Sequence, residues 1–447
     1  MQVVVSLMVE IDASAGIQEM ESQIQEAGQQ AMQQAFKHTI RQWEEAHLTC
    51  PHCGARTRRL EGTARRVIAT CFGRLSVPRR RFRCLQCGRR SCPATRLFAP
   101  LRGATITPAL QEAAQLAGCS WPYRVAAHLL GKLSGAQISA EEIRLVTNRQ
   151  GKQRAAQQQE EAQHICASPQ QEGSGAQHAE QPMLVGLDGG WVCSREQRGG
   201  MEGKVAVVCS QMDDLPMPVS DTSFSWSKRG GPRTAPRQRH RLAQRRYVAT
   251  FGPARQIGEQ AKAAAHTLDA DPSRPVVVIA DGAQWIKKEQ ATHFPQATCI
   301  LDWAHLWREV RQAILAAARG KPLDERAREY QLYLQRTRLW LGSIDLALDG
   351  LRELAKGLPA DSLKPVQEAI RYVKHQRPWM GSYEAWRKQG YPVGSGMIER
   401  AVSIVINRRM KKRGMRWCRQ NATAIVALRA DVLNEDWGTP QRLRAYP

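Results

Sequence analysis

Three aspartates directly follow short apolar runs whose length and β-branched content are typical of buried strands. They are Asp188, Asp281 and Asp302, and the runs before them are Met183–Leu187, Val276–Ala280 and Cys299–Leu301. A carboxylate at the carboxyl end of such a strand lies at the edge of an α/β sheet, where ligands and metal ions usually bind. We therefore expect these acids to meet at one edge of a sheet.

A fourth acid, Glu399, follows the turn sequence Gly394-Ser395-Gly396, which can bring the chain sharply into a helix. Taken singly, an Asp-Gly pair is usually a turn, and an early glutamate usually only favours the helix dipole. Taken together, Asp188, Asp281 and Glu399 could hold two hard cations with oxygen ligands. Such a pair activates water or a sugar hydroxyl for in-line attack at phosphorus.

Other residues are expected near this site. His305 follows Asp302 by three residues, although Asp302 could simply cap the helix that begins at the next residue. The indoles of Trp285, Trp303 and Trp307 could stack on an unpaired base near the site of reaction. Packing in the core is the alternative, and we expect it for at least one of the three.

The composition points to a nucleic-acid partner. The 447 residues carry a formal net charge of +24 and a pI near 10.0, spread along the chain, and such a field attracts polyanions. The apolar start, Val3–Met8, is too short for a secretory signal, and no run approaches the roughly 20 apolar residues of a membrane span. A cytoplasmic, nucleoid-associated protein is expected, whose paired cysteines are metal ligands rather than disulfides.

Two Cys-x-x-Cys-Gly turns predict a zinc site. Strand-like alternation over Arg66–Cys71 and Arg74–Phe82, around Phe72-Gly73, makes the whole a zinc ribbon over residues 49–100. The alternative is a pair of turns without metal, and Cys92 could compete as a ligand. The expected ligands are Cys50, Cys53, Cys84 and Cys87. Arginines crowd this module, and we expect phosphate contacts from Arg79, Arg80 and Arg81.

The elements on either side of the ribbon are expected to be helical. One long amphipathic helix, or two, is expected over Ile17–His47 within an N-terminal helical segment of residues 1–48, with a role in packing or dimerisation. Residues 101–155 form a helix-turn-helix-like module, whose last helix would carry Arg144, Asn148 and Arg149 into a major groove. A plain helical bundle is the alternative. In either case three helices are expected, over Thr107–Gly118, Trp121–Leu133 and Ser139–Arg154.

The composition of residues 156–182 is that of a linker, since it has few large apolar residues. The pattern of residues 183–319 predicts the first part of a mixed sheet with helices packed on it. Within it, Asp188-Gly189-Gly190 is expected to form the turn between the first two strands of a meander. Residues 320–391 form a helical insertion, and 392–447 complete the core with the Glu399 helix and a basic tail. The residues of that tail expected to hold DNA phosphates are Arg400, Arg408, Arg409, Lys411, Lys412 and Arg413.

These motifs, in this order, resemble the RNase H-like core of DDE transposases from bacterial insertion sequences, closest to the Kra group and more loosely to the Lre and Mutator-like groups. The resemblance covers most of the chain, zinc ribbon included. It rests on Leu-Asp188-Gly, Ala-Asp281-Gly-Ala-Gln-Trp-Ile, Leu-Asp302-Trp-Ala-His305, Gly-Ser-Gly-Met-Ile-Glu399-Arg and Arg409-Met-Lys-Lys-Arg-Gly-Met-Arg-Trp417.

The resemblance implies DNA transposition, a form of DNA recombination, by a mobile element. It implies cleavage at transposon ends and transfer of the freed 3′-hydroxyl into target DNA, with Asp188, Asp281 and Glu399 holding two Mg²⁺ or Mn²⁺ ions. Work on two ends implies at least a dimer. The alternatives are a non-catalytic zinc-containing DNA-binding regulator derived from a transposase, and an RNase H-like structure-selective nuclease.

Overall fold

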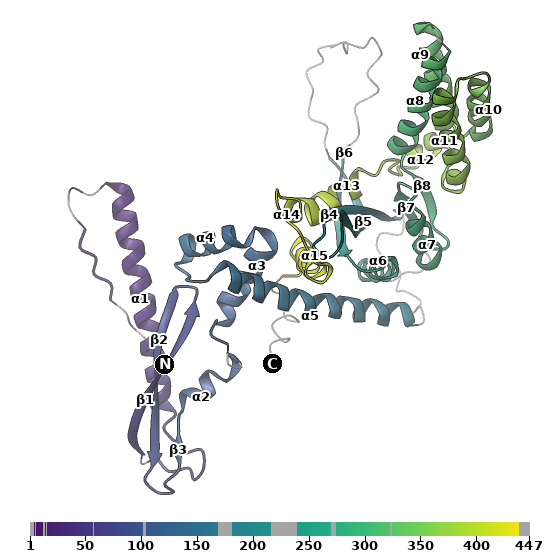
Figure 1. Cartoon of the computed structure of the whole chain (residues 1–447). Coiled ribbons are helices and arrows are strands. Elements are labelled where there is room, and N and C mark those ends of the chain that lie inside the picture. The colour runs from purple at the N-terminus through teal and green to yellow at the C-terminus, as the bar shows by residue number, and fades with distance from the viewer. Residues whose placement is uncertain are drawn as a thin grey trace. The chain divides into compact units, whose positions relative to one another are not determined.

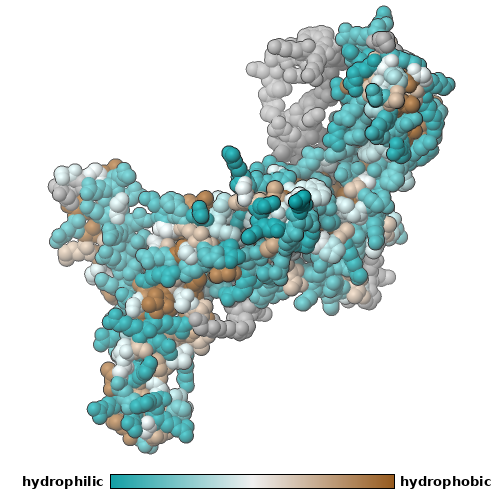
Figure 2. Space-filling model, viewed as in Figure 1, coloured by the Kyte–Doolittle hydropathy of each residue, from teal (hydrophilic) through white to brown (hydrophobic). Residues whose placement is uncertain are grey.

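The computed structural model describes residues 4, 6–11, 14, 16–56, 58–101, 104–168, 181–215, 239–269, 274–321 and 324–437. The chain divides into two compact units, one built on residues up to Gln150 and the other on Gly151–Asp436. It is mixed α/β, with two β sheets and many helices (Figure 1). None of the helices in the described ranges is long and apolar enough to cross a bilayer. The face drawn in Figure 2 is mainly hydrophilic, with small separate hydrophobic patches.

The first unit begins with one long helix and a β hairpin, as predicted (Figure 1). The hairpin is antiparallel and turns at Phe72, with Thr70 opposite Gly73, and it buries Ile68 and Leu75. Glu44 of the helix is buried and accepts hydrogen bonds from the backbone and guanidinium of Arg80, which ties helix to hairpin. The elements are α1 (Ile17–Ala46), β1 (Arg58–Thr70), β2 (Gly73–Cys84), β3 (Arg90–Ser91), α2 (Ala94–Leu97) and η1 (Ala99–Leu101).

Three further helices follow, as predicted, and they share an apolar core. A capping box begins the last helix, since the Ser139 hydroxyl accepts from the Glu142 backbone amide and the Glu142 carboxylate accepts from the Ser139 backbone amide. This helix continues well past Arg154, so residues 156–167 are helical and the linker prediction is wrong there. Glutamine, alanine and glutamate are good helix formers, which composition alone did not separate from linker sequence. The helices are α3 (Pro108–Ser120), α4 (Tyr123–Ser134) and α5 (Ala140–Ala167).

The second unit contains a mixed five-stranded sheet in the order β6-β5-β4-β7-β8. The β4–β5 and β5–β6 pairs are antiparallel, and β7 and β8 run parallel to β4 on its other side. The two buried strands expected before Asp281 and Asp302 are therefore confirmed as neighbours. The strands are β4 (Met183–Cys193), β5 (Gly200–Leu215), β6 (Arg239–Thr250), β7 (Val276–Ala280) and β8 (Thr298–Leu301).

The first strand differs from its prediction, because Asp188-Gly189-Gly190 lies inside continuous β4 and is not a turn. Gly190 serves close packing instead, since a Cβ there would lie 2.9 Å from Val402 Cγ1. The composition of Asp213–Arg246 predicts a loop, but this prediction is wrong at both ends, because β5 continues to Leu215 and β6 starts at Arg239. The rest of that loop lies outside the described residues.

The remaining elements are helices, and those after α8 and before the Glu399 segment fall within residues 320–391, the range predicted to be a helical insertion. Figure 1 shows α8 to α11 packed side by side. Their shared core includes Trp303, Trp307, Trp340 and Tyr383, with the Trp303 ring 4.9 Å from the rings of Trp340 and Tyr383. The helices are α6 (Ala254–Leu268), α7 (Gln284–His293), α8 (Trp303–Gly320), α9 (Glu325–Trp340), α10 (Ile344–Ala355), α11 (Ala360–Gln376), η2 (Arg377–Trp379) and α12 (Tyr383–Lys388).

The helix that carries Glu399 begins at Gly396, as expected, and runs on through a π-helical turn. Its first residues pack against β4 and β5. Single π turns inside helices are frequent at functional sites. The elements are α13 (Gly396–Val402), η3 (Ser403–Asn407), α14 (Arg408–Met410) and α15 (Arg419–Leu433).

Candidate metal centre and candidate active site

The four predicted cysteines come together in the first unit, and their sulfur atoms lie within 4.8 Å of one another. The Cys50 and Cys87 sulfurs are 3.8 Å apart, and those of Cys53 and Cys84 are 3.5 Å apart. Tetrahedral zinc with Zn–S bonds of about 2.3 Å needs sulfurs about 3.8 Å apart. The cluster is therefore compatible with a structural zinc ion, and Cys92 is not part of it.

Two matching turns position these thiols. In each, the glycine that follows the second cysteine has a positive φ, +76° at Gly54 and +70° at Gly88. The amides of these glycines donate to the carbonyls of Cys50 and Cys84, both at 3.0 Å. The backbone amide of His52, followed by that of Cys53, lowers the pKa of the Cys50 thiol to about 6. Such turns favour the thiolate form that binds metal.

In the second unit the predicted acids come from separate elements. Asp188 lies in the middle of β4, Asp281 directly follows β7, and Glu399 lies in the first turn of α13. The Asp188 carboxylate accepts from the Gly189 amide at 2.7 Å, and the Asp281 carboxylate accepts from the Ala283 amide at 2.9 Å. Both aspartates are half-buried, whereas Glu399 is exposed.

Electrostatics shows that these acids are neighbours. The pKa of Asp188 is raised to about 6, mainly by burial, although the hydrogen bond from the Gly189 amide lowers it. The charges of Asp281 and Glu399 raise it further, and His305 lowers it. Because the charges of Asp281 and Glu399 disfavour the ionised form of Asp188, a divalent cation, which prefers such oxygen ligands, would stabilise the Asp188 carboxylate here.

The closest ligand set in this unit is nonetheless a different one. Ligand atoms of Asp302, His305 and Glu399 all lie within 4.8 Å of one another, and Asp188 and Asp281 are outside that group. Asp302 and His305, expected near the site, therefore lie beside the predicted Glu399.

Asp302 connects the first turn of α8 to the turn that precedes Glu399. One carboxylate oxygen accepts from the backbone amide and the ring Nδ1 of His305, at 2.6 and 3.0 Å, and the other accepts from the Ser395 amide. Burial raises the pKa of Asp302, but these hydrogen bonds from His305 and Ser395 outweigh it and lower the pKa to about 2. Asp302 is thus the helix cap anticipated as an alternative, and it also fixes the turn before Glu399.

Ser395 has a role that the sequence pattern did not reveal. Its hydroxyl donates to Glu399 Oε1 at 2.8 Å while its amide donates to Asp302. In the sequence it was only the middle residue of a glycine-rich turn. Its spacing of four residues before Glu399 was the one available signal, because such a spacing puts both residues on one helical face.

The glycines of β4 let α13 lie against the face that carries Asp188. Gly186 and Gly190 are two residues to either side of Asp188 and so share its face of the strand. A Cβ at Gly186 would lie 3.0 Å from Ile398 Cβ. Strand β4 therefore carries no side chain at the positions where α13 packs against it.

Trp285 lies half-buried at the start of α7, with the Lys204 ammonium 5.6 Å from its ring centre. Trp303 and Trp307 belong to the helical core described above, as anticipated for at least one of them. Trp285 packs against the same apolar core and is equally half-buried, so burial does not single out one of the three indoles for contact with a base.

The cations expected to contact DNA differ in their availability. Arg79 donates to Thr95, Arg80 to Glu44, and Arg144 to Glu141. Asn148, expected in a groove, is buried and faces Tyr123 instead. The exposed members are Arg81, Arg149, Arg400, Arg408, Lys411, Lys412 and Arg413.

Arg409 corrects the prediction for the basic tail, because it is buried, with 1% exposure. Its guanidinium lies 5.1 Å from the Trp417 ring centre. Helical periodicity turns Val405, Ile406 and Arg409 to the same inward face, which a run of basic letters does not reveal. Arg409 is a packing residue in this structure.

No protein-family model matches the sequence, and no curated protein shows significant similarity to it. The conclusions about function below therefore rest on this chain's own residues.

Proposed function

We propose that the chain is a DDE-type DNA transposase of an insertion sequence, which cleaves DNA at transposon ends and transfers the 3′-hydroxyl into target DNA. The observation that carries the proposal is that Asp281 and Glu399 lie close enough to Asp188 for their charges to raise its pKa, beside the larger effect of burial. The three acids come from the central strand, the adjacent parallel strand and a helix packed on both β4 and β5.

The sheet supports an RNase H-like core for this proposal. An antiparallel meander of β4, β5 and β6 is extended on the other side of β4 by two parallel strands. A mixed sheet of this kind is compatible with such a core. Asp188 lies in β4 and Asp281 directly after β7, the neighbouring parallel strand, which favours the proposal.

The donor set fits Mg²⁺ or Mn²⁺, since it consists of carboxylates. Two such ions would activate the attacking oxygen and stabilise the leaving oxygen of an in-line displacement. The protein's own part is to hold the carboxylates. The Gly189 and Ala283 amides orient Asp188 and Asp281, and the Ser395 hydroxyl orients Glu399.

Asp302 and His305 are positioning residues in this proposal. Both oxygens of Asp302 already accept hydrogen bonds, so its carboxylate holds His305 and the Ser395 turn in place. Because His305 Nδ1 faces Asp302, the other ring nitrogen is directed away from this carboxylate.

The exposed cations favour DNA as the substrate. Arg400 and Arg408 lie on the same continuous helix as Glu399, which places positive charge beside the carboxylates. Together with the net charge of +24, this favours a polyanion over a small neutral substrate.

The test is cleavage of labelled duplexes that carry the DNA flanking the chain's own coding sequence, with Mg²⁺ or Mn²⁺. The native protein is compared with Asp188→Asn and Asp281→Asn, which remove a charge at nearly constant shape. We expect cleavage to fall at least about 10³-fold, since such acids act as one unit with the ions, while DNA binding is retained. Asp361→Asn, an exposed acid of α11, is the matched control and should leave cleavage unchanged.

The products decide between the candidate functions. Strand-joined products together with cleavage support the transposase. Cleavage without joining would point to a structure-selective nuclease, and tight binding without cleavage in either metal would point to a regulator.

A further inference from the structure

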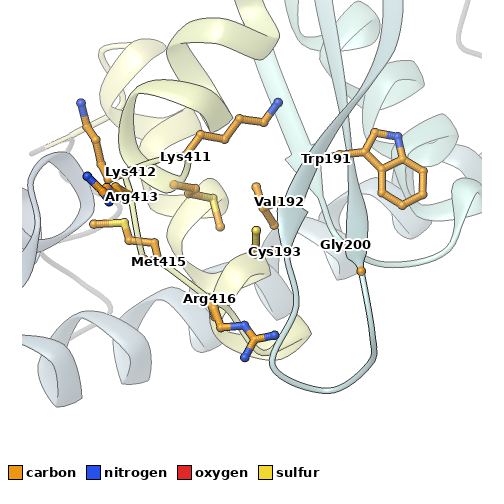
Figure 3. A pocket seen from close by; sticks show the side chains of 12 residues that line it. Trp191, Val192, Cys193, Gly200, Lys411, Lys412, Arg413, Met415 and Arg416 are labelled. Carbon is orange, nitrogen blue, oxygen red and sulfur yellow. The ribbon is translucent and has the colours of Figure 1, made fainter.

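A hollow of about 630 Å³ lies in the second unit between the β4–β5 hairpin and the segment that follows α14 (Figure 3). Its lining comes from Trp191–Cys193 and Gly199–Gly200 on the hairpin and from Met410–Arg416. The volume is within the range of roughly 300–1,000 Å³ that is usual for ligand sites. None of the carboxylates described above lines it.

The hollow is held in shape by backbone contacts at its edge. The Trp417 amide donates to the Cys193 carbonyl at 3.0 Å, and the Arg195 amide donates to the Trp417 carbonyl at 2.9 Å. The Trp417 indole donates to the Met410 carbonyl at 3.2 Å, and buried Arg409 packs on the same ring. Both ends of the basic segment are thus fixed against the core and the hairpin, so the site is largely preformed.

The lining combines an apolar floor with a cationic rim. Val192 and Met410 are buried and Met415 is half-buried, and Figure 3 shows Lys411 and Arg416 extending on either side of Val192 and Cys193. No residue that lines the hollow is acidic. The exposed cations of the rim are Lys411, Lys412, Arg413 and Arg416.

This combination narrows the chemistry of the ligand. A bare phosphate needs no apolar floor, and a purely apolar ligand gains nothing from four cations. A nucleotide needs both, but a duplex keeps the faces of its bases stacked inside. An unpaired strand presents base faces and phosphates together, and such strands bind where a basic groove meets flat or apolar side chains.

Trp191 adds a flat surface at the edge of the site. It is 60% exposed, although it is large and apolar, and it lines the hollow. Figure 3 shows its indole on the other side of the hairpin from Arg413 and Met415. A base that lies beyond the hollow along the same strand could stack there.

We propose that this hollow binds an unpaired stretch of a DNA strand, with a base over the apolar floor and flanking phosphates on the basic rim. The inference rests on the proposed function and adds to it the form of DNA that this face recognises. It concerns binding and needs no metal.

The first test measures binding of the full chain to a fluorescent thymidine strand of about 16 nucleotides, the upper end of single-strand site sizes, in buffer without Mg²⁺ or Mn²⁺ over a series of salt concentrations. The variant is the triple change Lys411→Gln, Lys412→Gln and Arg413→Gln. Each phosphate contact contributes about 0.7 to the salt slope of a single strand, so the slope should fall by about 2.

The matched control removes the same charge elsewhere in the second unit, through Lys364→Gln, Arg371→Gln and Lys374→Gln on the exposed face of α11. We expect this variant to keep most of the native slope. If both triple variants lost the same amount of salt slope, the strand would be attracted only by the overall positive charge of the chain. That result would overturn the inference.

The second test needs no variant. The native chain should bind the thymidine strand between about fivefold and about 150-fold more tightly than an abasic strand of the same length, because stacking contributes about that factor per base. Equal affinities would mean that only phosphates are bound, and the inference would then fail. Because no Mg²⁺ or Mn²⁺ is present, the binding test does not measure cleavage, and such a failure leaves the cleavage test of the proposed function untouched.

Discussion

The cysteine cluster of the first unit and the carboxylates of the second are assembled differently. All four thiols come from two matching turns between Cys50 and Cys87, joined by one hairpin. The carboxylates come from β4, β7, the start of α8 and α13, so that the acid nearest the N-terminus is Asp188 and the last is Glu399. One site is local in sequence, and the other depends on the whole sheet and on the helical insertion between its parts.

This difference has a physical consequence for stability. Each cysteine turn closes its own hydrogen bonds around a glycine of positive φ, and the hairpin brings the two turns together. The carboxylates instead lie on a framework held by other contacts, where burial and, to a smaller extent, the charges of Asp281 and Glu399 raise the pKa of Asp188. We expect zinc binding by the cysteine cluster to stabilise the first unit. In the second unit, by contrast, the fold holds the carboxylates in place.

The largest effect is therefore expected from loss of the zinc ligands. Cys84→Ser removes one thiolate ligand and therefore weakens zinc binding. In small zinc modules, metal binding contributes on the order of 10 kcal/mol to folding. The chain should lose its zinc and become sensitive to proteolysis between residues 49 and 100. Zinc content by mass spectrometry and limited proteolysis measure the two effects.

Cys92→Ser is the control, since Cys92 is half-buried in the same unit but lies outside the cluster. One zinc ion per chain should remain. A native zinc content in Cys84→Ser would contradict a four-cysteine site and would remove the contrast with the carboxylates.

The same contrast explains what the sequence could predict. The hairpin around Phe72-Gly73 and the four ligands were predictable because alternation, turn and ligand spacing are all local. Strand β7 was predicted to the residue, since a short apolar run ends at Asp281. The specific RNase H-like topology stays a prediction.

The errors came where a distant partner decides the structure. The pair Gly189-Gly190 resembled a turn, because the local sequence does not show that Val402 and Ile406 pack against β4 at Gly190. Arg409 resembled its exposed neighbours, although its helical face is inward. The role of Ser395 also depends on Asp302, a residue of another element.

A smaller effect is expected from Asp302→Asn, which tests whether the second unit holds its site. The amide group of asparagine would have to face an N–H donor from Ser395 or His305, so at least one hydrogen bond is lost in a buried place. The free energy of unfolding should fall by about 1–3 kcal/mol. Urea unfolding at neutral pH, followed by tryptophan fluorescence, measures it.

The pH dependence of that difference has a definite sign. Burial raises the pKa of Asp302, but the hydrogen bonds lower it to about 2, which is below the ordinary value of about 3.9. The carboxylate therefore contributes stability above about pH 4, and this contribution is lost as the pH falls toward 2. The gap between native protein and variant should narrow over that window.

Asp324→Asn is the matched control, because Asp324 also caps a helix and accepts from the Ala327 amide, but in an exposed place. Asparagine caps a helix about as well as aspartate, so the change should be close to zero. A loss at Asp324 as large as at Asp302 would mean that capping, and not the contact with Ser395, is what matters.

The smallest effect is expected from Gly186→Ala, which changes no ligand and moves only the framework. The new Cβ would lie 3.0 Å from Ile398 Cβ and from Met397 Cε, so α13 must shift by a few tenths of an ångström. A misplacement of about 1 Å can cost about 10²-fold in rate, so cleavage should fall by about threefold to tenfold with DNA binding unchanged. Gly62→Ala in β1 meets no atom within 4 Å and is the control in a strand. If Gly186→Ala cleaves DNA at the native rate, close packing of α13 on β4 is not what positions Glu399, and the distributed site is more tolerant than the comparison with the cysteine cluster implies.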